Sequence, residues 1–97
     1  MTGYDIDGVL TAGVEIEPNS VVISGRTWAE YDDFAKEAAQ KCPVYIRGTG
    51  TYGNAEAAGQ FKAQMIKMLG VTKFYEDDPY QADLIRAWNP NCEVILP

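Results

Sequence analysis

The feature that most constrains this chain is the alternation of short apolar segments, rich in β-branched residues, with longer segments of helical periodicity. The strand-like segments are residues 2–6, 21–23, 44–46, 73–76 and 94–96. The run Val21-Val22-Ile23 is apolar throughout, as are strands of parallel sheets that are buried on both faces. Strands that alternate with helices favour a parallel sheet joined by right-handed crossovers. The pattern therefore predicts an α/β fold with one five-stranded parallel sheet.

Helix signals at the level of single residues support this alternation. Thr27 and Glu30 have the spacing of a capping box, so a helix is expected to begin directly after Thr27. Gly70 is expected to cap the end of a second helix, and Asp78 followed by Pro79 is expected to start a third. Each helix is thus predicted to connect two successive strands of the sheet.

Residues 8–20 follow the first strand and are predicted to form a flap. Gly13 and Pro18 interrupt regular structure there, and the alternation in Val14-Glu15-Ile16-Glu17 indicates a short hairpin rather than a helix. Large aromatic side chains elsewhere are expected to contribute to the core, namely Trp28, Tyr31 and Trp88. Three acidic side chains are expected to be solvated charges, namely Asp32, Asp33 and Glu76.

Four acidic residues lie where the first and fourth strands are expected to end. They are Asp5, Asp7, Asp77 and Asp78. A doubly wound sheet has the natural order 3-2-1-4-5, which places strands 1 and 4 side by side and opens a ligand crevice beyond their carboxyl ends. Both acidic pairs therefore converge on one crevice. Carboxylates held this close repel one another unless a cation, a proton or hydrogen-bond donors compensate them.

Residues 5–11, Asp-Ile-Asp-Gly-Val-Leu-Thr, match motif I of the haloacid dehalogenase (HAD) superfamily, Asp-x-Asp-Gly-x-x-Thr. Residues 21–24 resemble motif II, Lys62 resembles the motif III lysine, and residues 77–78 resemble motif IV, so the resemblance covers nearly the whole chain. The Ser-Gly-Arg turn at residues 24–26 is similar to that of polynucleotide 3′-phosphatase domains. An EF-hand calcium loop would need further ligands, which the apolar residues after Gly8 do not supply.

The resemblance implies a single HAD-like domain over residues 1–97, a three-layer α/β/α Rossmann-like fold without a cap domain. It implies that Asp5 attacks phosphorus to form an aspartyl-phosphate, and that Asp7 acts as general acid and then as general base. It implies Mg²⁺ held by the Asp5 carboxylate, the Asp7 backbone carbonyl and a motif IV acid. Asp78 is the favoured direct ligand, with Asp77 acting in the second shell or through water.

The same resemblance assigns contacts to the phosphoryl group. Ser24 would donate a hydrogen bond to it, and Lys62 is preferred over Lys67 because it lies nearer the helix end expected at the catalytic edge. The substrate-binding residues are expected to be Ser24, Gly25, Arg26, Arg47 and Lys62. For Arg26 and Arg47 the alternative is a solvated side chain, and for residues 48–54 a plain turn is favoured over a substrate loop.

Composition limits the chemistry further. The net charge is −6 and the chain has no histidine, which excludes the usual histidine zinc sites and Ser-His-Asp catalysis. A strongly acidic chain is also a poor non-specific binder of nucleic acid. Cys42 and Cys92 lack metal-ligand spacing and are expected to be reduced thiols. Without a signal peptide or a long apolar run, the protein is expected to be soluble and cytoplasmic, with a homodimer possible because the core is small.

Three functions remain open at this level. The favoured one is a Mg²⁺-dependent phosphatase for exposed terminal phosphates of nucleotides or nucleic-acid ends, because residues 8–20 and 48–54 are too short to hold a cap domain. The alternative is a non-catalytic HAD-like domain that binds phosphorylated ligands or a protein partner. A phosphoacceptor domain resembling response-regulator receivers is disfavoured, because the third strand ends in Ile46-Arg47-Gly48 and provides no acceptor acid.

Overall fold

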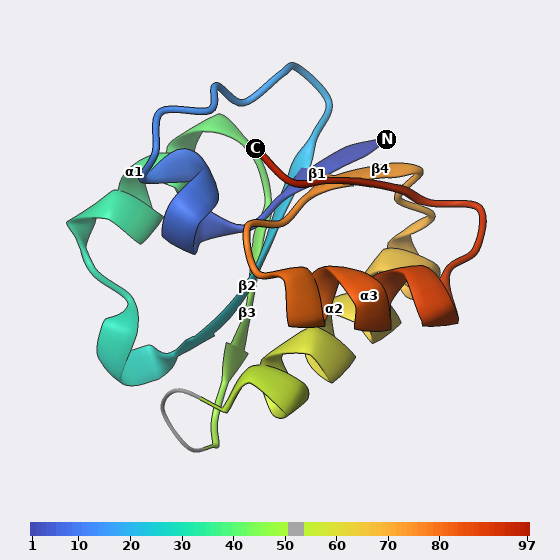
Figure 1. Ribbon diagram of the computed structural model, residues 1–97. Coiled ribbons are helices and arrows are strands. Elements are labelled where there is room, and N and C mark those ends of the chain that lie inside the picture. Colours follow the sequence, from blue (N-terminus) through green and yellow to red (C-terminus); the bar gives the residue numbers. More distant parts are fainter. Residues whose placement is uncertain (51–53) are drawn as a thin grey trace.

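The computed structural model describes residues 1–50 and 54–97. These residues form a parallel five-stranded sheet in the order β3-β2-β1-β4-β5 (Figure 1). The strands are β1 (Thr2–Tyr4), β2 (Val21–Thr27), β3 (Val44–Gly48), β4 (Lys73–Tyr75) and β5 (Glu93–Ile95). The predicted strand order is thus confirmed, and β1 lies between β2 and β4.

Three α-helices connect the strands of the described chain, namely α1 (Asp33–Lys41), α2 (Ala55–Leu69) and α3 (Pro79–Trp88). Two short helical turns, η1 (Ile6–Leu10) and η2 (Trp28–Glu30), follow β1 and β2. The predicted caps of the later helices are confirmed: Gly70 ends α2 in the left-handed region at φ 72°, and Asp78 caps α3 ahead of Pro79.

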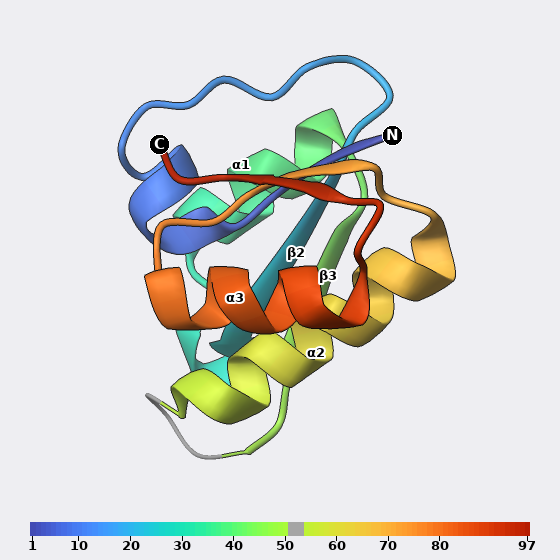
Figure 2. The ribbon, with the colours of Figure 1, turned by 45° about the vertical axis from the view of Figure 1, so that its right-hand side comes forward.

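The helices cover both faces of the sheet (Figure 2). On one face, α2 and α3 pack over a buried cluster centred on Ile23, Ile66 and Phe74. On the other, η1 and α1 close a second cluster that includes Tyr4 and Val22. This is a Rossmann-like α/β arrangement, in which the carboxyl ends of β1, β2 and β4 meet the start of α2 and α3.

The first α-helix begins later than expected. The predicted capping box is present, with the Glu30 side chain accepting from the Thr27 backbone N–H at 2.9 Å, but it closes only the single turn η2. Tyr31 then leaves the helical conformation at ψ 81°, and Asp32 caps α1 by accepting from Ala35 N–H at 3.0 Å. The prediction of a helix from residue 28 is therefore wrong by five residues, counted from residue 28 to residue 33.

The predicted hairpin flap is also wrong. Residues 11–20, all of which the structure describes, contain no strand, and the chain instead forms η1 and then an irregular segment. The alternation that suggested a strand places Val14 and Ile16 against the second cluster while Glu15 remains exposed. The alternation of apolar and acidic residues therefore reflects which side chains contact the core, in a segment that pairs with no strand.

Two aromatic predictions fail as well. Trp28 is 65% exposed and Trp88 is 44% exposed, whereas Tyr31 packs partly buried against the second cluster. Trp28 lies on the turn η2 and contacts Tyr31 edge to face, so this ring is half of a surface pair rather than part of the interior. Within the described residues, the helices are too short or too polar to cross a membrane.

Candidate active site

A cavity of about 350 Å³ opens at the carboxyl ends of the central strands. Its walls include eight of the residues predicted for the site: Asp5, Asp7, Gly25, Arg26, Arg47, Lys62, Asp77 and Asp78. The remaining one, Ser24, is fully buried in β2, accepts from the Arg26 backbone N–H at 3.1 Å, and does not line the cavity that the described residues form. The expected hydrogen bond from Ser24 to a phosphoryl group therefore has no direct path in this structure.

Asp5 lies directly beyond β1 and is almost fully buried, with 4% of its surface exposed. Its Oδ1 accepts from the Ile6 backbone N–H at 2.8 Å, and its Oδ2 lies 3.1 Å from the Lys62 ammonium. Burial raises the pKa of Asp5 because a carboxylate loses its water there, while Lys62 opposes that effect. The carboxylate is thus held by two donors and faces the cavity.

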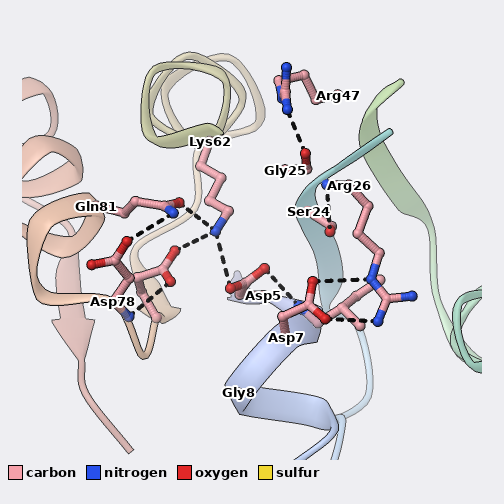
Figure 3. Close-up of polar contacts among 12 residues, drawn as sticks. Asp5, Asp7, Gly8, Ser24, Gly25, Arg26, Arg47, Lys62, Asp78 and Gln81 are labelled. Carbon is pink, nitrogen blue, oxygen red and sulfur yellow. Dashed lines mark hydrogen bonds and ion pairs between the residues drawn. The ribbon is translucent and has the colours of Figure 1, made fainter. Parts of the chain in front are cut away.

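Lys62 reaches from α2 into the cavity and is 2% exposed (Figure 3). Its ammonium contacts Glu76 Oε1 at 2.6 Å and Gln81 Oε1 at 2.7 Å, in addition to Asp5. Burial alone would lower the pKa of Lys62, but the charges of Asp5 and Glu76 outweigh it and raise that pKa. Lys67, the alternative on the same helix, is exposed, so α2 directs Lys62 and not Lys67 to the site.

Glu76 is the main residue that sequence reasoning missed. It was predicted to be a solvated charge, yet it is completely buried, with Oε1 on Lys62 and Oε2 accepting from Asp78 N–H at 3.2 Å. Its backbone N–H donates to Ile95 O at 3.0 Å, so strand pairing continues past β4. Burial, followed by the charge of Asp5, raises the pKa of Glu76 to about 8. The available signal was its position, directly after an apolar strand and before two aspartates.

Three carboxylates could hold a cation together. Asp5, Glu76 and Asp77 each offer an oxygen within 4.8 Å of the others. Gly8, at φ 76°, passes so close to the Asp77 carboxylate that a β-carbon at this position would collide with it. An all-oxygen cluster of this kind could hold a hard divalent cation.

Asp78 caps α3 and lines the cavity, as predicted, but it lies outside the three-carboxylate cluster. Its Oδ1 accepts from Tyr80 N–H at 3.0 Å and caps α3, while its Oδ2 accepts from the Gln81 side-chain amide at 3.0 Å. Both oxygens are therefore used by α3, and the three-carboxylate cluster contains Asp77 instead. The cluster favours Asp77 over Asp78 for contact with a cation, and the choice between the two stays a prediction for a binding experiment.

Arg26 lies on β2 and is 9% exposed. Its guanidinium pairs with both oxygens of Asp7, from Nε at 3.1 Å and from Nη2 at 2.8 Å (Figure 3). The hydrogen bond to Asp7 is the main cause of the raised pKa of Arg26. Arg26 is thus not a solvated turn residue. Its guanidinium does not point freely into the cavity either, because it already pairs with the Asp7 carboxylate in the cavity wall.

Arg47 lies on β3, one residue before its end at Gly48, and it also lines the cavity. Its Nε donates to the Gly25 carbonyl at 3.1 Å, and its Nη1 donates to Thr49 O at 2.9 Å. Gly25 leaves no room for a β-carbon because Ala58 packs against it, which lets α2 approach β2 closely. The predicted loop at residues 48–54 is described only in part, since residues 51–53 lie outside the described residues.

Comparisons with known protein families, with curated proteins and with solved structures found no match. The functional assignment of the cavity therefore rests on its own residues. These combine a buried, doubly hydrogen-bonded aspartate, a buried lysine and an acidic cluster that could hold a divalent cation.

The raised pKa of Glu76 predicts how the stability of the metal-free protein depends on pH. Between its ordinary value of 4.5 and about 8, the folded protein keeps a proton that the unfolded chain has released. The free energy of unfolding should therefore fall by a few kcal/mol as the pH rises through this window. Urea unfolding in EDTA at several pH values measures this slope. Glu76→Gln should flatten it, whereas Glu93→Gln, which changes an exposed acid on β5, should leave it unchanged.

Proposed function

We propose that the protein is a Mg²⁺-dependent phosphomonoester hydrolase that acts through an aspartyl-phosphate on Asp5. The observation that supports this most is the burial of Asp5 at the carboxyl end of β1, between Lys62 and the carboxylates of Glu76 and Asp77. A buried carboxylate beside a buried lysine and a cation site is the donor set that phosphoryl transfer needs. The sheet with helices on both faces is also what a HAD-like three-layer domain would have.

The reaction would proceed in two displacements. In the first, an Asp5 oxygen forms a bond to phosphorus, the bond to the leaving oxygen breaks, and that oxygen takes a proton from Asp7. In the second, water forms the new bond to phosphorus, Asp5 leaves, and the proton of the water returns to Asp7. Lys62 and the Ile6 N–H hold the Asp5 carboxylate in place for both steps.

Mg²⁺ would be held by Asp5, Asp77 and Glu76 in this proposal, since these carboxylates form the cluster. When bound, it would supply positive charge that offsets the phosphoryl oxygens in the transition state. The cavity needs that charge, because its acids outnumber its cations. The acids are Asp5, Asp7, Glu30, Glu76, Asp77 and Asp78, and the cations are Arg26, Arg47 and Lys62. We therefore expect inorganic phosphate to bind the protein in Mg²⁺ but not in EDTA.

The proposed substrates are exposed terminal phosphates of nucleotides or of nucleic-acid ends. The connection between β1 and β2 consists of the turn η1 and an irregular segment, and it forms no folded domain that could close over the cavity. Lys62 and Arg26 are each already paired with acids, so no basic patch in the described cavity wall is left to hold a long phosphodiester backbone. Affinity for an oligonucleotide should then depend only weakly on salt.

A screen tests the proposed function. Phosphate release is measured from nucleotides, sugar phosphates and 3′-phosphorylated oligonucleotides, in Mg²⁺ and in EDTA. We expect phosphate release in Mg²⁺ but not in EDTA, with nucleotides or oligonucleotide ends among the substrates. Binding of these compounds without any release would instead favour a non-catalytic domain that recognises phosphate. An absence of both binding and release would rule out either function.

The identity of the metal-binding acid has its own test. Asp77→Asn should weaken Mg²⁺ binding by roughly tenfold or more, because it removes a charge from the three-carboxylate cluster. Asp78→Asn is the matched control, since asparagine also caps a helix and Asp78 lies outside that cluster. Isothermal titration calorimetry with Mg²⁺ measures both variants. Equal losses of affinity would show that Asp78 is a ligand after all.

A further inference from the structure

The Arg26 guanidinium is enclosed by the turn η2 and the start of α1. Besides its two bonds to Asp7, its Nη1 donates to the Glu30 carbonyl at 3.0 Å and to Asp32 Oδ1 at 2.9 Å. All but one of its N–H donors thus have a partner among the described residues. A phosphate that accepts two hydrogen bonds from this guanidinium would have to displace Asp7, Asp32 or the Glu30 carbonyl, so Arg26 is poorly placed to bind substrate through a paired contact.

Asp32 connects this guanidinium to α1 through hydrogen bonds. Its Oδ1 accepts both from Arg26 and from the Ala35 backbone N–H at the first turn of α1. The helix therefore fixes Asp32, and Asp32 with the Glu30 carbonyl fixes the plane of the guanidinium. A planar guanidinium that meets a carboxylate through two parallel bonds determines the direction in which that carboxylate faces.

Asp7 depends on Arg26 for its orientation, because it is exposed and its backbone lies outside regular helix geometry. It is 63% exposed and lies in a non-helical part of η1, directly before Gly8 at φ 76°. Its two bonds to Arg26 hold it in the cavity wall. A long chain of contacts thus runs from α1 through Asp32 and Arg26 to Asp7, and it ends where the proposed proton transfers occur.

We propose that Asp32 is a positioning residue for the proton transfers of Asp7, acting through Arg26. The inference rests on the function proposed above and adds a residue that does not touch the substrate. Asp32 holds Arg26 so that one Asp7 oxygen meets the leaving oxygen in the first displacement and the attacking water in the second. Its loss leaves Arg26 with fewer restraints, and Asp7 then spends less time in the productive orientation.

The test compares Asp32→Ser with Asp33→Ser. Serine caps a helix about as well as aspartate but has a shorter side chain, so Asp32→Ser should keep α1 and lose the contact to Arg26. Asp33→Ser removes the same charge one residue further along α1. Steady-state kinetics are measured in Mg²⁺ with phenyl phosphate, whose leaving group needs a proton, and with 4-nitrophenyl phosphate, whose leaving group needs it much less. Thermal unfolding of each variant checks that the fold is kept.

Asp32→Ser should lower kcat for phenyl phosphate roughly tenfold, and should lower kcat less for 4-nitrophenyl phosphate, with KM nearly unchanged. Asp33→Ser should match the wild type. Asp32→Asn, which keeps the Oδ1 acceptor, should restore most of the rate. Equal kcat in both serine variants, or a rise in KM that is the same for both substrates, would overturn the role of Asp32 while leaving the proposed function intact. A wild-type protein without turnover would overturn the proposed function itself, and the inference with it.

Discussion

Asp5→Asn should lower phosphate release by about 10³-fold or more while the fold stays intact. Asparagine keeps the size of the side chain and can still accept from the Ile6 N–H, but its amide cannot form the bond to phosphorus. The change also removes one negative charge from a buried group in which Asp5 and Glu76 share a single lysine. The metal-free variant should therefore unfold at the same urea concentration as the wild type or at a slightly higher one.

The control for this variant is Asp83→Asn on α3, which changes an exposed acid whose side chain pairs with Arg86. It should leave turnover and stability unchanged, since exposed pairs contribute little. Phosphate release at the wild-type rate by Asp5→Asn would show that Asp5 is not the nucleophile. A large loss of stability in Asp5→Asn would show that its carboxylate serves the fold rather than a reaction.

Lys62→Met should cost about 3–5 kcal/mol of stability at neutral pH in the absence of metal. Methionine has a similar length, but it leaves the carboxylates of Asp5 and Glu76 buried together without their ammonium. The folded variant can then bury these two carboxyl groups only if they take up protons. The loss of stability should therefore be largest at high pH. Below about pH 3, where both carboxyls are protonated in the folded and the unfolded state, the difference from the wild type should be smallest.

Lys67→Met provides the matched control, because it makes the same substitution at an exposed position on α2. It should change the free energy of unfolding by less than about 0.5 kcal/mol. Urea unfolding of both variants across the pH range gives the comparison. A loss in Lys62→Met that is the same at every pH would point to packing of the side chain rather than to its charge.

The strand order could be predicted from sequence because strands and helices leave strong periodic signals. The β-branched run at residues 21–23 and the caps at Gly70 and Asp78 are local features, and each has one dominant physical explanation. With the connections short and right-handed, few sheet orders remain. The convergence of Asp5, Asp7 and Asp77 followed from that order, because all three lie just beyond strands β1 and β4.

The paired geometry inside the cavity could not be predicted in the same way. Glu76 is buried because strand pairing continues one residue past β4, and a run of three acids gives no indication of which one points inward. Asp32 is exposed, as expected, but its ion pair with Arg26 was not predicted because Arg26 belongs to another element, β2. The alternation at residues 14–17 failed because contact with a core produces the same period as strand pairing. Each error concerns a tertiary contact.

The most direct test of the central claim is mass spectrometry of the protein after rapid acid quenching during turnover of 4-nitrophenyl phosphate in Mg²⁺. The expected result is one added phosphoryl group on the peptide that contains Asp5, which should accumulate further in Asp7→Asn because water is then activated less well. Asp5→Asn should carry none. Turnover without any phosphorylated Asp5 peptide in the wild type or in Asp7→Asn would contradict the proposed aspartyl-phosphate.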